Sequence, residues 1–158
     1  MLQFPLMQRG EYQKAREAKD GSRLSIGIVV SSFNTDITEP MLEGARATLK
    51  EWGVKDENVT VLRVPGSFEL PYGCLKLIKE RKPDGIIAIG CVIKGDTEHD
   101  RYIATATADG LMRLTLDHFV PISFGVITTN TLEQAQIRST GETNKGKEAA
   151  LAVLELLA

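Results

Sequence analysis

The chain has 158 residues and a mass of 17.3 kDa, which is the length of one ordinary domain. Its 42% apolar and 25% charged residues are typical of a globular protein, and they exclude collagen-like, coiled-coil and wholly disordered chains. A net charge of −2 gives no basic excess, and no apolar run approaches the roughly 18 residues of a membrane span, so we expect neither a nucleic-acid nor a membrane partner.

The first residues are polar and show no periodicity. We therefore predict a flexible N-terminal arm over residues 1–22 and a single domain over 23–158. The start of the chain lacks the pattern of a secretory signal, so a cytoplasmic location is expected. Cys74 and Cys91 form no CxxC pair and the histidines are widely spaced, so no metal site is predicted.

Four short runs rich in β-branched residues recur along the chain, at 24–30, 59–64, 85–92 and 120–127. Each is apolar on both faces, which is typical of a parallel sheet covered by helices on both sides.

Helical spacing of apolar residues fills the gaps between these runs. It predicts a helix through Leu42 to Trp52, one through Leu70 to Ile78, one over 98–118, a shorter helical turn from Leu132 and a last helix over 149–157. The alternation predicts a three-layer α/β/α sandwich of the flavodoxin-like type, with a four-stranded parallel sheet flanked by helices.

Ligands of such sheets bind outside the carboxyl ends of the strands. The segments that follow the four runs are Ser31–Asn34, Pro65–Glu69, Lys94–His99 and Thr128–Asn130, and they bring aromatic, carboxylate and imidazole groups to one edge. The chain has no GxxxxGK[ST], GxGxxG or GxSxG motif, which disfavours P-loop, dinucleotide and hydrolase functions.

The segment after the third run has the features of an anion pocket. Gly95 permits a tight turn, and Thr97 is expected to cap the next helix, so peptide N–H groups near Asp96 and Thr97 could hold a phosphate. Nearby acidic side chains oppose an anion. An arginine from elsewhere is therefore needed, and Arg138 is the candidate.

Each of these side chains also has an ordinary structural explanation. His99 suits proton transfer, but it is equally an exposed surface residue. Phe33 and Phe68 either fill the core or form ligand platforms, and Cys91 packs as a small apolar residue. Other residues with a purely structural alternative are Glu69 at a helix start, Arg138 and Lys145 as surface charges, and His118 at a helix end.

Five strings in this order and spacing carry a family resemblance. They are Phe33-Asn34, Pro65-Gly66-Ser67-Phe68-Glu69-Leu70-Pro71, Gly90-Cys91-Val92-Ile93-Lys94-Gly95-Asp96-Thr97-Glu98-His99, Phe124-Gly125-Val126-Ile127-Thr128-Thr129 and Asn144-Lys145-Gly146. Over residues 25–158 the chain resembles the 6,7-dimethyl-8-ribityllumazine synthase family of riboflavin biosynthesis.

The resemblance implies a transferase that condenses 5-amino-6-(D-ribitylamino)uracil with 3,4-dihydroxy-2-butanone 4-phosphate, giving 6,7-dimethyl-8-ribityllumazine, phosphate and water. It implies no cofactor and no metal, and it makes His99 the proton carrier. The residues that it assigns to the ribitylaminouracil are Phe33, Ser67, Phe68, Glu69, Cys91, Val92, Ile93 and Phe124. Those that it assigns to the butanone phosphate are Asp96, Thr97 and Arg138, with Lys145 as an auxiliary contact.

The resemblance also implies a homopentamer whose active sites lie between subunits, with Phe124 and Arg138 contributed by the neighbour. Riboflavin synthase is a further partner that it suggests. Pentamer, decamer and sixty-subunit shell stay open as assemblies. Two alternatives share the fold: a protein that binds flavin or lumazine without turnover, and a container. A rate of lumazine formation above the uncatalysed rate would distinguish the enzyme from both.

Overall fold

A parallel sheet with helices on both faces forms the protein. The computed structural model describes residues 20–158. The strands are β1 (Ile26–Ser31), β2 (Val59–Val64), β3 (Gly85–Ile93) and β4 (Ile122–Thr129). The helices are α2 (Thr35–Glu51), α3 (Leu70–Arg81), α4 (His99–His118), α5 (Leu132–Ser139) and α6 (Lys145–Leu157), with 3₁₀ turns η1 (Asp56–Asn58), η2 (Ser67–Glu69) and η3 (Gly141–Thr143).

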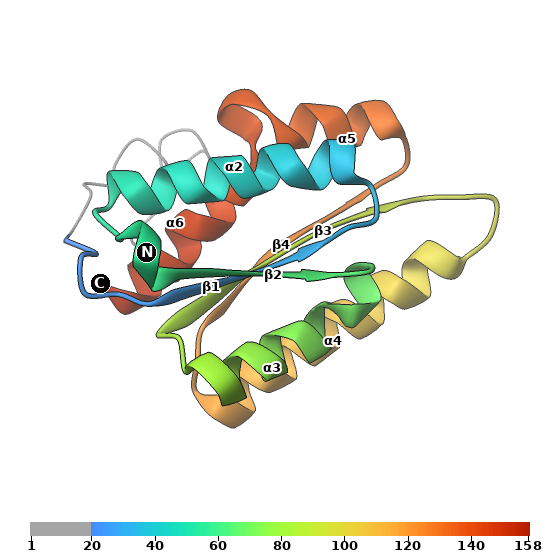
Figure 1. The fold of residues 1–158 in the computed structure, drawn as a ribbon. Helices are drawn as coiled ribbons and strands as arrows, with labels where there is room; N and C mark the ends of the chain where they lie inside the picture. The colour runs from blue at the N-terminus through green and yellow to red at the C-terminus, as the bar shows by residue number, and fades with distance from the viewer. Residues whose placement is uncertain (1–19) are drawn as a thin grey trace, which may run out of the picture.

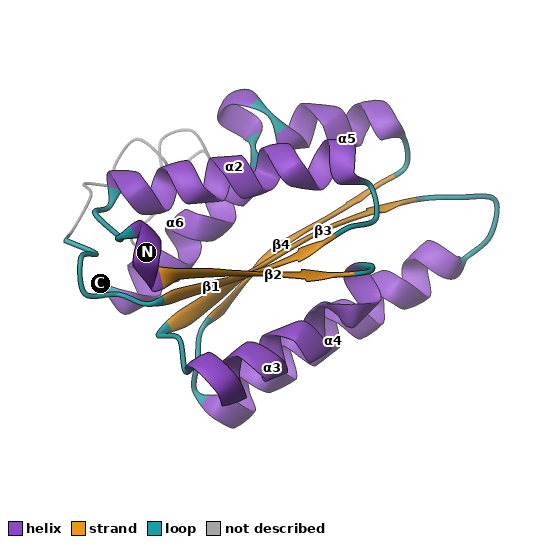
Figure 2. Cartoon of the chain, viewed as in Figure 1, coloured by secondary structure: helices purple, strands orange, loops and turns teal. Residues whose placement is uncertain are grey.

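The strand order is β2-β1-β3-β4 and all pairs are parallel. Helices α2, α5 and α6 cover one face, and α3 and α4 cover the other (Figures 1 and 2). This confirms the predicted α/β fold with a four-stranded parallel sheet flanked by helices on both faces. The order reverses between β1 and β3, which is the point where such sheets bind ligands.

The core has two parts, one on each face of the sheet. On one face, Ile28 of β1 and Ile89 of β3 pack with α2 and α6; on the other, Val29 and Ala88 pack with α3 and α4. Successive strand residues point to opposite faces, so a strand covered on both sides must be apolar at every position. All six residues of β1 are buried, which explains its uninterrupted apolar run.

Several elements begin at residues other than those predicted: α2 begins at Thr35, ahead of the predicted stripe from Leu42, and α4 begins at His99 rather than at residue 98. Strand β1 begins at Ile26 because the Ser25 N–H is taken by the Asp84 carboxylate, 2.7 Å away, and β4 begins at Ile122 because Pro121 has no N–H to donate. Helix α6 begins at Lys145, four residues earlier than expected, because the Asn144 side chain caps its first amides.

Most of the predicted N-terminal arm lies outside the described residues, and residues 20–22 are its described part. There, the Gly21 N–H donates to the Trp52 carbonyl at 2.7 Å, next to the end of α2. Within residues 20–158 no helix is long and apolar enough to cross a membrane.

Candidate active site

A cleft of about 880 Å³ opens at the carboxyl ends of β1, β2 and β3, beside the start of α4. We call it the aromatic cleft. Its walls are Phe33 and Asn34, residues 65–69, residues 91–93, Gly95, Thr97 and one side of α4 from His99 to Ala106. It therefore lies at the switch in strand order, and it brings nine of the predicted site residues together.

Two aromatic rings stand open in this cleft. Phe33 is 69% exposed and Phe68 is 60% exposed, so neither side chain fills the core. The backbone under Phe33 is nevertheless fixed, because Ser32 and Phe33 donate their N–H groups to the carbonyls of Val64 and Pro65 at 2.8 and 2.9 Å. A firmly held, open ring is a platform on which a flat heterocycle can stack.

Asn34 joins the ends of β1 and β3 across the switch point. Its backbone is left-handed, with φ 60° and ψ 49°, a conformation that asparagine tolerates better than most residues. Its side-chain amide donates to the Cys91 carbonyl at 3.1 Å. The pairing of β1 with β3 ends at Ile89, while β3 continues to Ile93. Main-chain groups of residues 91–93 therefore face the cleft without a strand partner on that side.

The η2 turn forms the floor beside β2. The Glu69 carboxylate accepts from the Gly66 N–H at 2.9 Å, and the Thr107 hydroxyl donates to the Ser67 carbonyl at 3.0 Å, so both α4 and the turn itself fix this segment. The Ser67 hydroxyl is buried without a hydrogen-bond partner and lies against Gly90 of β3. It does not point into the open cleft. Ser67 can therefore reach a ligand through its main chain.

The start of α4 places His99 at the mouth of the cleft. His99 is exposed and is the first residue of the helix. Glu98 takes the N-cap position predicted for Thr97, and the Thr97 hydroxyl accepts from the His99 N–H at a long 3.4 Å. Asp96 is exposed and lines neither this cleft nor the second one described below.

Besides Asp100, three lining residues of α4 were not predicted as site residues: Tyr102, Ile103 and Ala106. They follow His99 at intervals of three, four and seven residues, which is the spacing of one helix face. Helical periodicity counted from His99 could have found them. Tyr102 is 71% exposed and adds a third open aromatic ring.

Within residues 20–158, the aromatic cleft is lined by acidic side chains without a lysine or arginine to balance them. Its ionisable lining residues are Glu69, Asp100, His99, Cys91 and Tyr102, and no lysine or arginine of the described chain lines it. Burial raises the pKa of the Cys91 thiol to about 11, so this cysteine is a neutral packing residue near pH 7. The cleft alone therefore offers no strong cationic partner for a phosphate.

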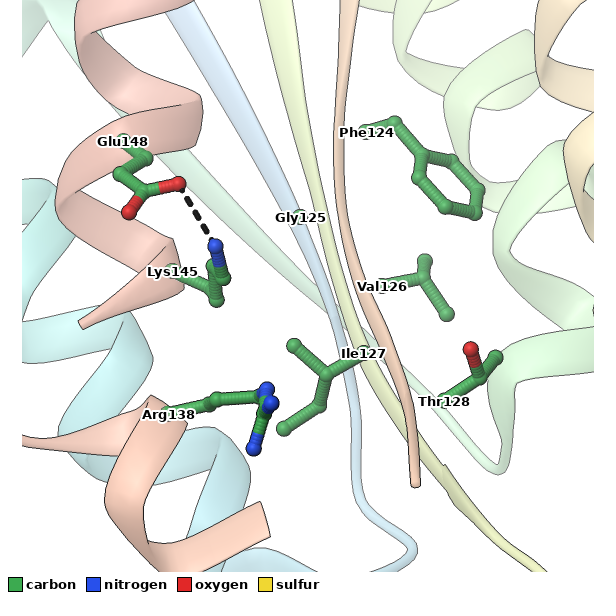
Figure 3. Close-up of a pocket in the computed structure, with 8 residues that line it drawn as sticks. All are labelled: Phe124, Gly125, Val126, Ile127, Thr128, Arg138, Lys145 and Glu148. Atoms are coloured by element: carbon green, nitrogen blue, oxygen red, sulfur yellow. Dashed lines mark hydrogen bonds and ion pairs between the residues drawn. The ribbon is translucent and has the colours of Figure 1, made fainter. Parts of the chain in front are cut away.

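A second cleft, of about 330 Å³, lies along β4, the edge strand of the sheet. We call it the cation-lined cleft. It is lined by residues 124–128, Arg138, Lys145 and Glu148. Figure 3 shows Arg138 at the end of α5 and Lys145 on α6 on one side of β4, while Phe124 projects on the other side.

The side chains of this second cleft are held at defined positions. The Lys145 ammonium pairs with the Glu148 carboxylate at 2.9 Å, and both side chains are about four-fifths buried. The Arg138 guanidinium donates to the Gln134 carbonyl at 3.0 Å but remains exposed. The Phe124 ring is half exposed. Glu148 had not been predicted, although its spacing of three from Lys145 on a helix is a recognisable signal.

The two clefts share no lining residue. With the exception of Asp96, the predicted site residues of a single chain thus fall into an aromatic, acidic group and a group with two cations. Among residues 20–158, no group of three or more His, Cys, Asp or Glu side chains is placed to hold a metal ion.

A family model and several curated relatives point to the same family. Residues 23–158 match the family model described as 6,7-dimethyl-8-ribityllumazine synthase. The 6,7-dimethyl-8-ribityllumazine synthase of Phocaeicola vulgatus is 46% identical over 87% of this chain and 83% of its own length. The enzymes of the same name from Parabacteroides distasonis and Porphyromonas gingivalis are 44% and 47% identical, over 87% and 86% of this chain and 87% and 85% of their own.

Proposed function

The chain belongs to the 6,7-dimethyl-8-ribityllumazine synthase family and is a lumazine synthase, a transferase of riboflavin biosynthesis, and from this we propose that each active site is built from the aromatic cleft of one copy and the cation-lined cleft of the next. The separation of charges between the two clefts carries the proposal. The butanone phosphate needs a cation beside the aromatic cleft, and Arg138 and Lys145 line a different cleft of the same chain.

The aromatic cleft suits the ribitylaminouracil. Phe33 offers an open face on which the pyrimidine stacks. The main chain of residues 91–93 extends past the end of β1 and offers hydrogen bonds to the edge of the ring. The turn over Ser67, Phe68 and Glu69 faces the ribityl chain, with the free capacity of the Glu69 carboxylate available to its hydroxyls. Phe124 of the neighbouring copy closes the stack from outside.

The butanone phosphate occupies the junction of the two clefts. Thr97 and the turn around Asp96 contribute hydrogen-bonding groups from one copy, and Arg138 contributes the positive charge from the other. Asp96 and Asp100 disfavour a phosphate unless a cation balances them, so Arg138 accounts for most of the phosphate affinity. Lys145 is an auxiliary contact, because its ammonium already forms an ion pair with the Glu148 carboxylate.

His99 moves the protons of the reaction. The primary amine of the pyrimidine attacks the ketone and water leaves; phosphate is then eliminated, and attack on the second carbonyl closes the ring with loss of water. Each step transfers protons between nitrogen, carbon and oxygen atoms, which one imidazole at the mouth of the cleft can serve. Holding the substrates side by side contributes more, roughly 7–11 kcal/mol of the barrier for well-oriented reactants.

The surface of α4 supports a ring of copies. This 20-residue helix buries only Thr107 and Leu111. Tyr102, Met112 and Leu116 along it, and Phe119 directly after it, are each more than half exposed. Apolar side chains exposed along a whole helix are typical of an interface between subunits. We propose a homopentamer, or an assembly of pentamers, in which this helix packs against the next copy.

Subunit complementation tests the shared site. We expect the variants His99→Ala and Arg138→Ala each to be strongly impaired when pure. If the two are co-expressed in equal amounts and assemble at random, about a quarter of the sites receive a native aromatic cleft and a native cation-lined cleft. Activity should then rise toward a quarter of the native value.

A matched control combines His99→Ala with Phe33→Ala. Both changes lie in the aromatic cleft, so no site regains a native cleft and activity stays low. Equal behaviour of the two mixtures would contradict a site shared between copies.

A further inference from the structure

Asn144 uses the full hydrogen-bonding capacity of its side chain. Its amide N–H groups donate to the carbonyls of Pro40 and Ser139, at 2.9 and 2.7 Å. Its amide oxygen accepts from the N–H groups of Gly146 and Lys147, at 2.8 and 3.3 Å. The residue is 4% exposed. One buried amide thus ties the middle of α2, the end of α5 and the start of α6 together.

Two glycines make room for this arrangement. A Cβ atom on Gly44 of α2 would lie 2.6 Å from the Asn144 amide nitrogen, and one on Gly146 would lie 1.8 Å from the Met41 carbonyl oxygen. The amide therefore lies flat against α2, and the first turn of α6 touches the α2 backbone. The space admits an asparagine amide in one orientation only, because each end faces groups of opposite hydrogen-bonding character.

Two of the groups that Asn144 binds, the Ser139 carbonyl and the Gly146 N–H, belong to residues next to the two cations of the cation-lined cleft. Ser139 follows Arg138 directly, and Lys145 lies between Asn144 and the capped Gly146. Figure 3 shows Arg138 and Lys145 projecting from these two helix ends into the same space. The connection between them, residues 139–144, contains Gly141 at φ 60° and a single 3₁₀ turn. Asn144 bonds to both ends of this connection, while the Thr143 hydroxyl bonds only back to the Ile137 carbonyl of α5 and the Thr140 carbonyl.

We propose that Asn144 is a positioning residue that holds Arg138 and Lys145 at their spacing in the cation-lined cleft and thereby sets affinity for the phosphate of the substrate. The inference rests on the proposed function, since it needs Arg138 as the phosphate ligand. Its physical basis is that a charge-assisted contact weakens steeply when a cation moves by even an ångström from its partner.

The variant Asn144→Asp separates the two halves of this link. A carboxylate has the same shape and still accepts from the amides of Gly146 and Lys147, but it cannot donate to the carbonyls of Pro40 and Ser139. It therefore keeps the cap of α6 and gives up the bonds to α2 and α5. The variant Asn144→Ser, which keeps a short capping oxygen, repeats the test with a neutral side chain. Thr143→Val is the matched control, because it removes a bond to the Ile137 carbonyl in the same connection and leaves Asn144 intact.

The measurements are the KM for each substrate, kcat and the inhibition constant of inorganic phosphate, with thermal unfolding at fixed protein concentration. We expect Asn144→Asp to raise the butanone phosphate KM and the phosphate inhibition constant by roughly 10-fold, with the pyrimidine KM and kcat within about twofold of native. Thr143→Val should change none of them. An unchanged phosphate constant, an equal loss in every parameter, or failure of both Asn144 variants to fold would each overturn the positioning role.

Arg138→Ala in the same experiment distinguishes this inference from the proposed function. If Arg138→Ala weakens phosphate inhibition and Asn144→Asp does not, only the role of Asn144 is lost. If Arg138→Ala leaves phosphate inhibition unchanged, the assignment of Arg138 to the phosphate is wrong, and the inference is lost with it.

Discussion

The contact between Gly90 and Ser67 predicts how the pyrimidine side of the cleft responds to one added methyl group. A Cβ on Gly90 would lie 2.5 Å from the Ser67 hydroxyl oxygen and 3.0 Å from a methyl carbon of Leu70. All three residues are buried, so the methyl group cannot be placed unless the η2 turn moves away from β3. We expect Gly90→Ala to lower the free energy of unfolding by about 1–3 kcal/mol, the usual cost of overpacking.

A double-mutant cycle identifies the atom responsible. The Ser67 hydroxyl has no hydrogen-bond partner, so Ser67→Ala removes no bond, and we expect its stability to be unchanged or up to about 1 kcal/mol higher. In the double variant the new methyl group meets the Cβ of residue 67 at 3.3 Å, a tight but tolerable contact. Ser67→Ala should therefore recover part of the loss caused by Gly90→Ala, with a coupling energy of about 1–2 kcal/mol.

The assay is thermal or urea unfolding at one protein concentration, together with the pyrimidine KM. Gly90→Ala should raise that KM because the displaced turn carries Phe68 and Glu69, and the double variant should restore it in part. Gly95→Ala is the stability control, since its Cβ would meet nothing within 4 Å. Strictly additive losses in the cycle would refute the reasoning, because the clash would then lie elsewhere.

Three further predictions concern the core, the thiols and His99, the proposed proton carrier. Gly146→Ala places a Cβ 1.8 Å from the Met41 carbonyl oxygen, so thermal unfolding should show a free energy of unfolding lower by about 3 kcal/mol or more. Gly141→Ser is the comparison: its φ is 60° and its Cβ lies in open space, so it should lower the free energy of unfolding by about 1 kcal/mol. Burial raises the pKa of Cys91 to about 11 and of Cys74 to about 12, from an ordinary value of 9.0. The native thiols should therefore react slowly with a thiol reagent at pH 8. Because the unfolded chain releases these protons at a lower pH than the folded chain does, the free energy of unfolding should fall progressively as the pH rises above 9.0. His99→Ala should lower kcat by about 10²- to 10⁴-fold in steady-state assays without abolishing activity, since orientation of the substrates persists; complete loss would contradict that division of roles.

The sheet was predictable because its pattern is local. Strand β1 is buried at every position and β3 at all but its last, so both appear in the sequence as uninterrupted apolar runs. The start of α6 was not predictable in the same way. It depends on the Asn144 side chain, whose orientation is fixed by the Pro40 carbonyl, a residue 104 positions away in the chain. Local periodicity carries no information about such a bond.

The candidate site shows the same difference between residues that a local pattern locates and residues whose place depends on distant parts of the chain. Phe33, Phe68 and His99 could be located because the carboxyl ends of parallel strands meet at one edge, which places their following segments together. Asn34 was placed at this edge without a role of its own, and Tyr102 was missed, although a helical interval from His99 points to it. The separation of Arg138 from Phe33 required the strand order. That order depends on which strand pairs with which, and no short segment determines it.

The strand order also supports the proposal that one chain does not complete the site. The aromatic cleft lies at the switch between β1 and β3, whereas the cation-lined cleft follows β4, which ends the sheet. Arg138 and Lys145 are therefore held at the margin of the molecule, where a neighbouring copy can approach. Under the proposed assembly, the free energy that binds one copy to the next also creates the phosphate site, so dilution that separates the copies must remove activity even though each chain stays folded. Affinity between subunits and affinity for the phosphate are then coupled, and each must strengthen the other by the same factor.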